Sequence, residues 1–433
     1  MKTIIRISLI AALLLTVITT QSASAGNSGT KKNYQQDYLV IKGKVVDAEN
    51  GTPLVFASVA VKETNIAIIT NIDGEFTLKI GESVTAQNLE ITVLGYKNKT
   101  VPLSELKNNG YKNVIKLEQA TVSIKEVVVR PMDPEKIVEN AIHFMDKNYV
   151  QIPNLMTAFY RETIRKNRTY VSIGEAVVEV FKTPYYNDAR YDATRIYKGR
   201  KSTDVEKMDT VLFKLQGGPV NNLQLDVVKN TESILTYKAM ENYNYTLSGV
   251  VEIDNKPHYK ISFVQKPSVE IPLFMGDFYI EMETFAITEV EFGFNLSDKE
   301  QAASIFIRKK PFGMSIYPEM VTYRTKFREQ DGKWYFAYSR AEAKFKVDWK
   351  KRLFNTYYTT MSELAITDRT DKEVIKFAGK EKFKHGDVFS EKVGSFSDPK
   401  FWGDYNVIEP DQSIESVIRK LSRKLKFSEW TEN

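Results

Sequence analysis

Alternation of apolar and polar residues with a period of two is the feature that most constrains the fold of this chain. Glu75–Ile80 and Leu89–Val93 alternate in this way, and Asn50–Gly51 and Asn71–Gly74 are tight-turn signals between such segments. Successive side chains of a strand point to opposite faces, so the pattern predicts half-buried strands. Short strands with turns at intervals of about 8–12 residues are typical of a β-sandwich. We therefore predict a compact β-sandwich over residues 38–120.

The order of residues in this block is similar to that of a known accessory domain. The matching segments are Gly43–Asp47, Gly51–Leu54, Ala57–Val59, Thr70–Phe76 and Leu94–Tyr96. Together they resemble the carboxypeptidase regulatory-like domain, a transthyretin-like β-sandwich. The resemblance implies an accessory module, because the peptidases that carry this domain have their active site in a separate catalytic domain. No part of the chain matches that catalytic domain, so we do not expect peptidase activity.

Residues 121–153 are predicted to form a linker strand and an amphipathic helix. Asp133 is a favoured N-cap residue, Pro134 suits the first helical position, and apolar residues then recur at helical spacing as far as Met145. Ile124–Val129 looks like the strand that ends the domain in TonB-dependent outer-membrane receptors. In those receptors a plug and a large barrel follow, whereas here we expect a helix.

Residues 154–370 are predicted to form a second, larger β domain. Long alternating segments pair as hairpins across Asp254–Asn255 and Asp331–Gly332. We expect one large antiparallel sheet that curls, with a few helices packed on it, so the predicted fold class is mainly β. Within this region, Tyr259–Phe263 followed by Phe278–Ile287 is similar to the hairpins of periplasmic lipoprotein-carrier half-barrels.

The two ends of the chain predict export and a surface helix. Residues 1–25 have the basic, apolar and small segments of a secretory signal peptide, and residues 26–37 are predicted to be a flexible leader. No Cys follows the apolar segment, so we do not expect a lipid-anchored signal. Residues 371–433 are predicted to be an irregular tail that ends in an amphipathic helix. Its basic face is either solvated or in peripheral contact with anionic membrane headgroups, through Arg419, Lys420, Arg423 and Lys424.

Composition limits the chemistry that the chain can perform. It has no Cys and three His among 433 residues, so thiol chemistry and Cys metal sites are excluded. His143 and Asp146 form a degenerate His-x-x-Glu pair without a second His, which favours a helix-surface histidine over a zinc ligand. His258 follows a Pro beside a turn and is expected to be exposed. No P-loop or Gly-x-Ser-x-Gly motif is present. We therefore predict no catalytic residue, no cofactor and no metal, and a net charge of +6 without a basic stripe predicts no nucleic-acid partner.

The aromatic residues allow two interpretations. The chain has 23 Tyr, 24 Phe and 4 Trp, which suit a β core and the surfaces of sheets. Alternatively, some of them form a stacking face or an apolar concavity for a glycan or a lipid. The predicted ligand-binding residues are three adjacent pairs: Tyr185 and Tyr186, Tyr357 and Tyr358, Phe401 and Trp402.

These observations favour a non-enzymatic protein of the bacterial cell envelope, in the periplasm or at the periphery of the outer membrane. Its accessory sandwich would accompany a β-rich binding domain for a partner protein, an apolar or lipid ligand, or a glycan. One alternative is an integral outer-membrane β-barrel, which the aromatic-rich strands suggest. The chain nevertheless ends in a basic helix where such barrels have an amphipathic strand. Another alternative is a hydrolase with an acid-only site, since such sites leave no local motif.

Overall fold

The computed structural model describes residues 38–85, 87–107, 112–120, 132–203, 215–230, 233–307, 312–350, 355–395, 401–411, 414–416 and 418. The predicted signal peptide, the leader, the strand at 124–129 and the basic residues Arg419, Lys420, Arg423 and Lys424 lie outside the described residues. By its internal contacts, Asp37–Asn433 forms one unit of its own. None of the helices in the described part of the chain combines the length and apolar character needed to span a bilayer.

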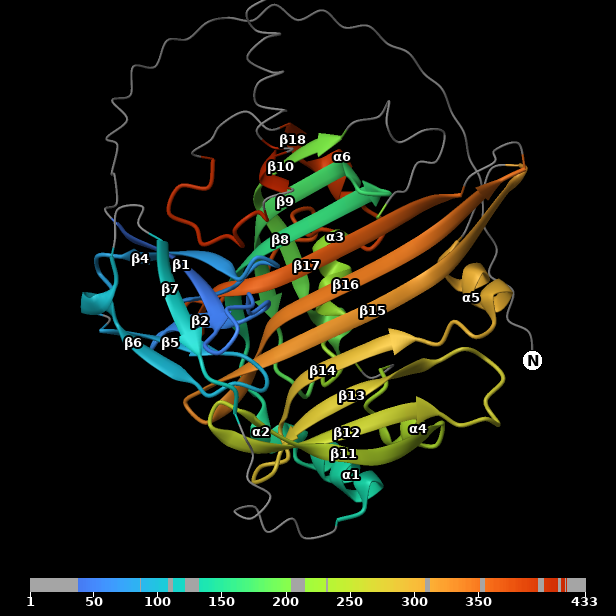
Figure 1. The fold of residues 1–433 in the computed structure, drawn as a ribbon, viewed down its shortest axis with the longest axis horizontal. Helices are drawn as coiled ribbons and strands as arrows, with labels where there is room; N and C mark the ends of the chain where they lie inside the picture. The colour runs from blue at the N-terminus through green and yellow to red at the C-terminus, as the bar shows by residue number, and fades with distance from the viewer. Residues whose placement is uncertain are drawn as a thin grey trace, which may run out of the picture. The chain divides into compact units, whose positions relative to one another are not determined.

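The first part of the structure is a pair of small sheets, as the period-two alternation predicts (Figure 1). One sheet has the order β4-β1-β7, in which β1 pairs antiparallel with β4 and parallel with β7. The other has the order β3-β2-β5-β6, followed by the short helix η1. The elements are β1 (Tyr38–Asp47), β2 (Ser58–Val61), β3 (Ala67–Ile69), β4 (Glu75–Gly81), β5 (Asn88–Thr92), β6 (Lys99–Pro102), η1 (Leu103–Glu105) and β7 (Lys112–Leu117). We call these two sheets the sandwich.

The second part is one large sheet with the order β11-β12-β13-β14-β15-β16-β17-β8-β9-β10-β18. Its strands are β8 (Asn154–Lys166), β9 (Thr169–Lys182), β10 (Ala193–Thr203), β11 (Tyr243–Ile253), β12 (Lys256–Gln265), β13 (Phe274–Glu281), β14 (Ile287–Phe294), β15 (Met314–Gln330), β16 (Lys333–Trp349), β17 (Thr356–Thr370) and β18 (Gly394–Ser395). All neighbours are antiparallel except β10 and β18. The sheet is open, with β11 and β18 at its edges, and it does not close into a barrel.

Helices pack on this sheet, as predicted. They are α1 (Pro134–His143), α2 (Met145–Asn148), η2 (Ala189–Tyr191), α3 (Gly218–Leu223), α4 (Tyr237–Met240), α5 (Lys299–Phe306) and α6 (Phe389–Lys392). The predicted start of α1 is confirmed, since the side chain of Asp133 accepts a hydrogen bond from the backbone N–H of Glu135. The helix α3 begins at Gly218, directly after Gly217. Gly217 precedes that helix with a φ of 84°, a left-handed conformation that glycine adopts readily.

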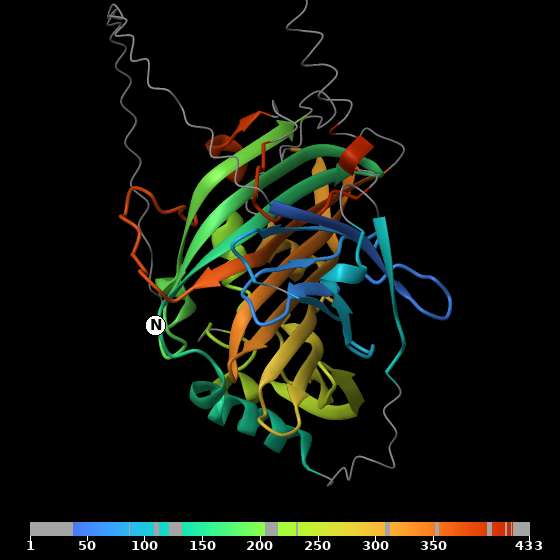
Figure 2. The same ribbon diagram turned by 90° about the vertical axis from the view of Figure 1, so that its left-hand side faces the viewer.

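The sandwich and α3 lie on opposite faces of the large sheet, which curls (Figures 1 and 2). The hydroxyl of Thr325 donates to the carbonyl of Leu225, just after α3, at 2.7 Å. The next residue, Lys326, points the other way, and its Nζ donates to the carbonyl of Phe56 in the sandwich at 3.1 Å. We therefore call the face that carries Thr325 the helix face and the face that carries Lys326 the sandwich face.

Each face has its own apolar core. On the helix face, Ile137 and Val138 of α1 and Leu223 of α3 pack in one cluster with residues of the sheet. On the sandwich face, the sandwich core extends without a break into the sheet, because Phe159 and Tyr338 belong to the same cluster as the inner sandwich residues. The large sheet thus serves as the common wall of two cores.

Candidate functional site

The six aromatic residues predicted to bind a ligand do not meet in one place. Tyr185 is buried, and its hydroxyl donates to Asp226 at 3.0 Å, whereas its neighbour Tyr186 is 68% exposed. Tyr358 is buried and Tyr357 half-buried. Trp402 is buried against Phe159, with ring centroids 5.6 Å apart, and Phe401 is half-buried beside it. None of the six lines a cavity described below, and their role in binding stays a prediction.

A network of buried ion pairs occupies the sandwich face. Arg161 donates from Nη2 to Glu175 at 2.8 Å and from Nη1 to Glu363 at 3.4 Å. Arg200 reaches the second oxygen of Glu175 at 2.8 Å, and Arg340 reaches Glu363 at 3.4 Å. Burial opposes the ionisation of Glu175, but attraction to Arg161 and Arg200 outweighs it and lowers its pKa. A carboxylate held ionised in this way is a poor general acid, so this network does not favour an acid-only hydrolase.

A polar cavity of about 210 Å³ lies beside this network. Its wall is shared by the sandwich, the sheet and the tail: Phe56 and Asn71 come from the first, Arg165 and Glu342 from the second, and Asp411 from the third. Arg165 and Glu342 face each other at 3.7 Å. With acidic and basic groups matched in pairs, the cavity is suited to hold water molecules at the junction of the three segments.

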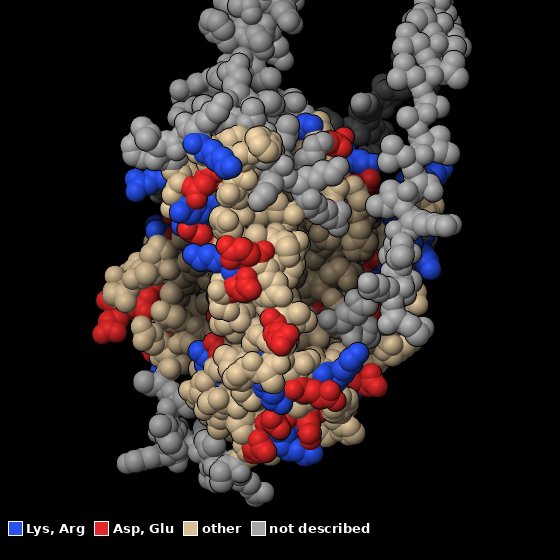
Figure 3. All heavy atoms as spheres, turned by 90° about the vertical axis from the view of Figure 1, so that its right-hand side faces the viewer, with Lys and Arg blue, Asp and Glu red and all other residues tan. Residues whose placement is uncertain are grey.

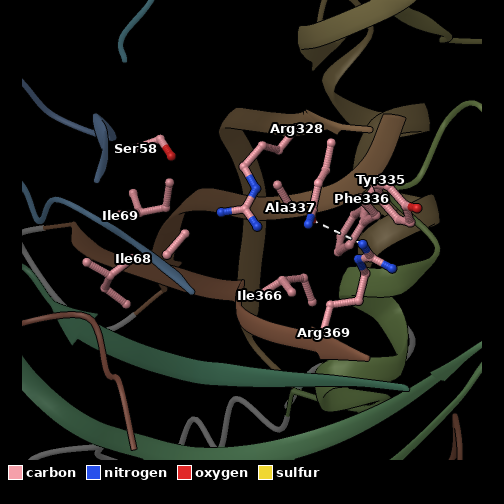
Figure 4. A pocket seen from close by; sticks show the side chains of 11 residues that line it. Ser58, Ile68, Ile69, Arg328, Tyr335, Phe336, Ala337, Ile366 and Arg369 are labelled. Carbon is pink, nitrogen blue, oxygen red and sulfur yellow. Dashed lines mark hydrogen bonds between the residues drawn. The ribbon is translucent and has the colours of Figure 1, made fainter. Parts of the chain in front are cut away.

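A second, smaller cavity of about 20 Å³ separates β3 from strands β15–β17 (Figure 4). Arg369 lies over the ring of Tyr335 at 3.7 Å, and its Nη2 donates to Asn65 and to Gln330, each at 3.1 Å. Arg328 also faces the space, and burial together with the nearby Arg369 lowers its pKa to about 10. The space holds about one water molecule, so these side chains form a docking contact between the sandwich and the sheet.

Another buried network fastens a loop near α3 to the edge of the sheet. Lys182 is fully buried and donates to Asp192 at 2.9 Å and to Asp226 at 2.6 Å. Lys229 donates to Asp192 at 2.6 Å, and burial together with the neighbouring Lys182 lowers its pKa to about 8. Two ammonium groups and two carboxylates are paired here with no opening to solvent, which is the arrangement of a structural brace.

The histidines offer no catalytic group. His143 is exposed on α1, as predicted. The expectation that His258 is exposed is wrong, because its side chain is fully buried and its Nδ1 lies 2.8 Å from the carbonyl of Lys256. Burial lowers the pKa of His258 to about 4, so the ring is neutral at physiological pH. Within the described residues, no group of three His, Asp or Glu side chains is placed to hold a metal ion.

The helix face carries two neighbouring rows of small side chains. In one row, Ala341 of β16 pairs with Ser362 of β17, and Gly174 of β9 follows beyond β8. In the next row, Ala343 pairs with Thr360, and the buried Ile164 of β8 separates Thr360 from Ser172 of β9. Ala341 is two residues from Ser339, which contacts Asn222 of α3, so Ala341 lies on the helix face. Directly opposed residues of a sheet share a face, so the other residues of its row lie there too. We call these six small residues the small-residue floor.

Larger elements flank the small-residue floor on both sides. On one side, the hydroxyl of Ser339 donates to the carbonyl of Asn222 in α3 at 2.9 Å. On the other side, Phe306 of α5 packs on Phe345 and Phe294, with centroid distances of 6.4 and 5.2 Å. Between them, the floor residues Ala341, Ala343 and Ser362 are only half-buried. Seen from the side of α5, the molecule has a hollow whose visible wall is uncharged (Figure 3).

One acid lies within these two rows. Glu162 stands between Ser362 and Gly174, is 6% exposed, and accepts a hydrogen bond from the hydroxyl of Tyr160 at 2.8 Å. Burial raises the pKa of Glu162 to about 7. Our sequence analysis missed this residue. The sequence does hold one indication of its position: Glu162 is two residues from the apolar Ile164 in β8, so the two side chains lie on the same face.

Comparison with known families identifies the first part of the chain. Residues 41–129 match the CarboxypepD_reg-like domain. The resemblance drawn from the turn and strand residues is therefore confirmed, and strands β2–β7 fall within this domain. The match leaves the large sheet outside it. No curated protein matches the chain.

Several solved structures are similar to the chain at low identity. One is an outer membrane lipoprotein-sorting protein domain from Vibrio parahaemolyticus, with 9% identity and a TM-score of 0.25, covering 56% of this chain and 95% of that one. Another is a DUF1329 family protein from Desulfovibrio piger ATCC 29098, with 13% identity and a TM-score of 0.21, covering 54% and 94%. A third is lipovitellin, with 9% identity and a TM-score of 0.21, covering 58% and 28%.

Proposed function

We propose that this chain is a non-catalytic protein of the cell envelope that binds an apolar ligand, such as an acyl chain, on the small-residue floor. The observation that carries the proposal is the floor itself. Two rows that carry Ala, Gly, Ser and Thr, interrupted on β8 by Glu162 and Ile164, lie between α3 and α5 on a face that is otherwise packed with large side chains. The CarboxypepD_reg-like domain, an accessory module, and the predicted signal peptide at residues 1–25 support the envelope setting.

The physical argument is one of volume and polarity. Protein interiors are close-packed, so two adjacent rows of small side chains leave space unless something fills it. The neighbouring Phe345 and Tyr323 offer apolar surface, and burial of apolar area contributes about 25 cal/mol per Å². Polar oxygens are few on the floor, where Ser362 and Thr360 are the hydroxyl residues closest to its middle. An elongated apolar molecule fits these properties better than a glycan, which needs many hydrogen-bonding partners.

Ala343→Phe tests the proposal by filling the floor. The probe is a neutral dodecyl chain that carries a dansyl group, whose fluorescence increases and shifts to the blue in an apolar site. We expect saturable binding to the wild type and at least a tenfold loss of affinity in Ala343→Phe, because the new ring occupies the ligand's place. Ala343→Ser keeps the space and is the matched control.

A second variant guards against misfolding of the first. Ser362→Leu adds volume from the next strand, and its unfolding midpoint shows whether the fold is kept. Weakened binding in both filled variants, with wild-type affinity in Ala343→Ser, supports the proposal. Absence of saturable binding to the wild type, or wild-type affinity in a folded Ala343→Phe, would overturn it.

A further inference from the structure

Glu162 is the feature of the helix face that an apolar ligand leaves unexplained. A carboxylate has room for about four hydrogen bonds, yet within the described residues Glu162 has one, from the hydroxyl of Tyr160. Glu162 is directly opposite the partly accessible Ser362 of the small-residue floor in the pairing of β8 with β17. On the other side, a Cβ added to Gly174 would meet the ring of Phe389 at 2.7 Å, so Phe389 closes that end of the row.

The other buried acids of the large sheet are paired with cations. Glu175 and Glu363 contact arginines, and Glu289 lies 3.2 Å from Lys326. Glu281 lies 3.2 Å from Lys256. Glu162, in the described part of the sheet, makes no ion pair. Burying an acid without a cation is costly. A buried carboxyl group without a cation in the protein therefore indicates that the ligand brings the cation.

Two lysines on neighbouring elements, Lys201 and Lys392, are already engaged. Lys201, in the row of Gly174 on β10, donates from Nζ to the carbonyl of Ser390. Lys392 at the end of α6 pairs with Asp387 at 3.2 Å. Tyr160, the hydrogen-bond donor to Glu162, is fully buried and neutral, since burial raises its pKa well above the ordinary value. Neither lysine therefore competes with a ligand for the carboxyl group.

We propose that the ligand of the small-residue floor is an amphiphile with an ammonium head group, which donates its N–H groups to the carboxylate of Glu162 while its chain lies on the floor. The inference rests on the proposed function and names the chemical class of its ligand. A charge-assisted hydrogen bond out of water is about twice as strong as a neutral one. The same carboxylate repels an anionic head, so the site discriminates between lipids by the charge of the head group.

Three ligands of equal chain length test the inference: dodecylamine, dodecanol and dodecanoate, each below its micellar concentration. Binding is measured by displacement of the neutral dansyl probe at pH 8. We expect the wild type to bind dodecylamine at least tenfold more tightly than dodecanoate. Glu162→Gln should remove this preference and leave dodecanol unchanged. Glu283→Gln changes an exposed acid and is the matched control.

The pH dependence gives an independent readout. An alkylammonium group, with a pKa near that of Lys at about 10.4, keeps its charge from pH 6 to 8. Glu162 takes up a proton as the pH falls through its pKa of about 7. The affinity of the wild type for dodecylamine should therefore fall severalfold between pH 8 and pH 6, and that of Glu162→Gln should not.

The outcomes separate this inference from the proposed function. Equal binding of all three ligands, or a preference for dodecylamine that persists in Glu162→Gln, would overturn the head-group inference and leave apolar binding in place. If neither dodecanol nor the neutral probe binds the wild type, the proposed function itself is wrong. Loss of the dodecylamine preference in Glu283→Gln as well would show a general surface-charge effect and would also overturn the head-group inference.

Discussion

The two faces of β8 differ sharply although one residue step separates them. On the sandwich face, Arg161 is buried and contacts Glu175 and Glu363. On the helix face, the next residue, Glu162, is also buried and has Tyr160 as its hydrogen-bond partner. The first face keeps the charges of this network because each of its arginines meets an acid and the pairs are covered. The second face has small residues and one unpaired acid where covering elements leave a gap.

This difference explains why the register of the large sheet is fixed. A slip of one residue would move Arg161 into the apolar core and Glu162 beneath the sandwich. The first movement is unfavourable, because it leaves Arg161, Glu175 and Glu363 without their partners. The contrast also separates stability from binding. The paired charges join strands of the large sheet on its sandwich face, and we expect substitutions there to change stability, whereas substitutions on the small-residue floor should change ligand affinity.

The largest effect is expected from Arg161→Ala, which breaks the network on the sandwich face. Removal of the guanidinium leaves Glu175 and Glu363 buried with fewer cations, and loss of one partner of a buried ion pair costs about 3–5 kcal/mol. Urea unfolding followed by circular dichroism measures the change. Lys97→Ala removes an ion pair of the same type from the surface and should leave stability unchanged. If the two variants unfold at the same urea concentration, the network contributes no stability.

The next effect concerns the unpaired acid on the opposite face. The pKa of Glu162 is raised to about 7 in the folded protein, against an ordinary value of 4.5. The contribution of Glu162 to stability is thus complete below pH 4.5 and is lost as the pH rises through 7. Gln is neutral throughout, so the stability of Glu162→Gln relative to the wild type should grow by about 3 kcal/mol from acidic pH to pH 8.

Urea unfolding of both proteins between pH 5 and 8.5 checks this prediction. Glu283→Gln, at an exposed position, should show no such trend relative to the wild type. A constant difference between Glu162→Gln and the wild type over this range would mean that Glu162 titrates in the folded protein as it does in water. The contrast between the two faces would then be one of packing alone.

Local patterns predicted much of the fold but little of the site. The N-cap of α1 at Asp133 and the hairpins around Asp254 and Asp331 depend on neighbouring residues, so the sequence indicates them directly. The pairing of β8 with β17 is not local. It brings Arg161 to Glu363 across 202 positions, and alternation alone does not show which strand lies beside which. Glu162 was missed for the same reason, since its face becomes known only when the neighbouring strands are placed.

The smallest effect is expected at the contact between Asn65 of the sandwich and Arg369 on the sandwich face of the large sheet. Asn65 donates from Nδ2 to the carbonyl of Arg369 at 2.6 Å and accepts from the Nη2 of the same residue at 3.1 Å. Asn65→Ala should cost about 1–2 kcal/mol, because buried groups of Arg369 lose a partner. Urea unfolding measures this cost, with Lys97→Ala again as the surface control. If Asn65→Ala is as stable as that control, the sandwich is held to the sheet by its apolar contacts with Tyr338 and Trp402. The polar residues of the sandwich face would then fix the register of the strands and contribute little to the attachment of the sandwich.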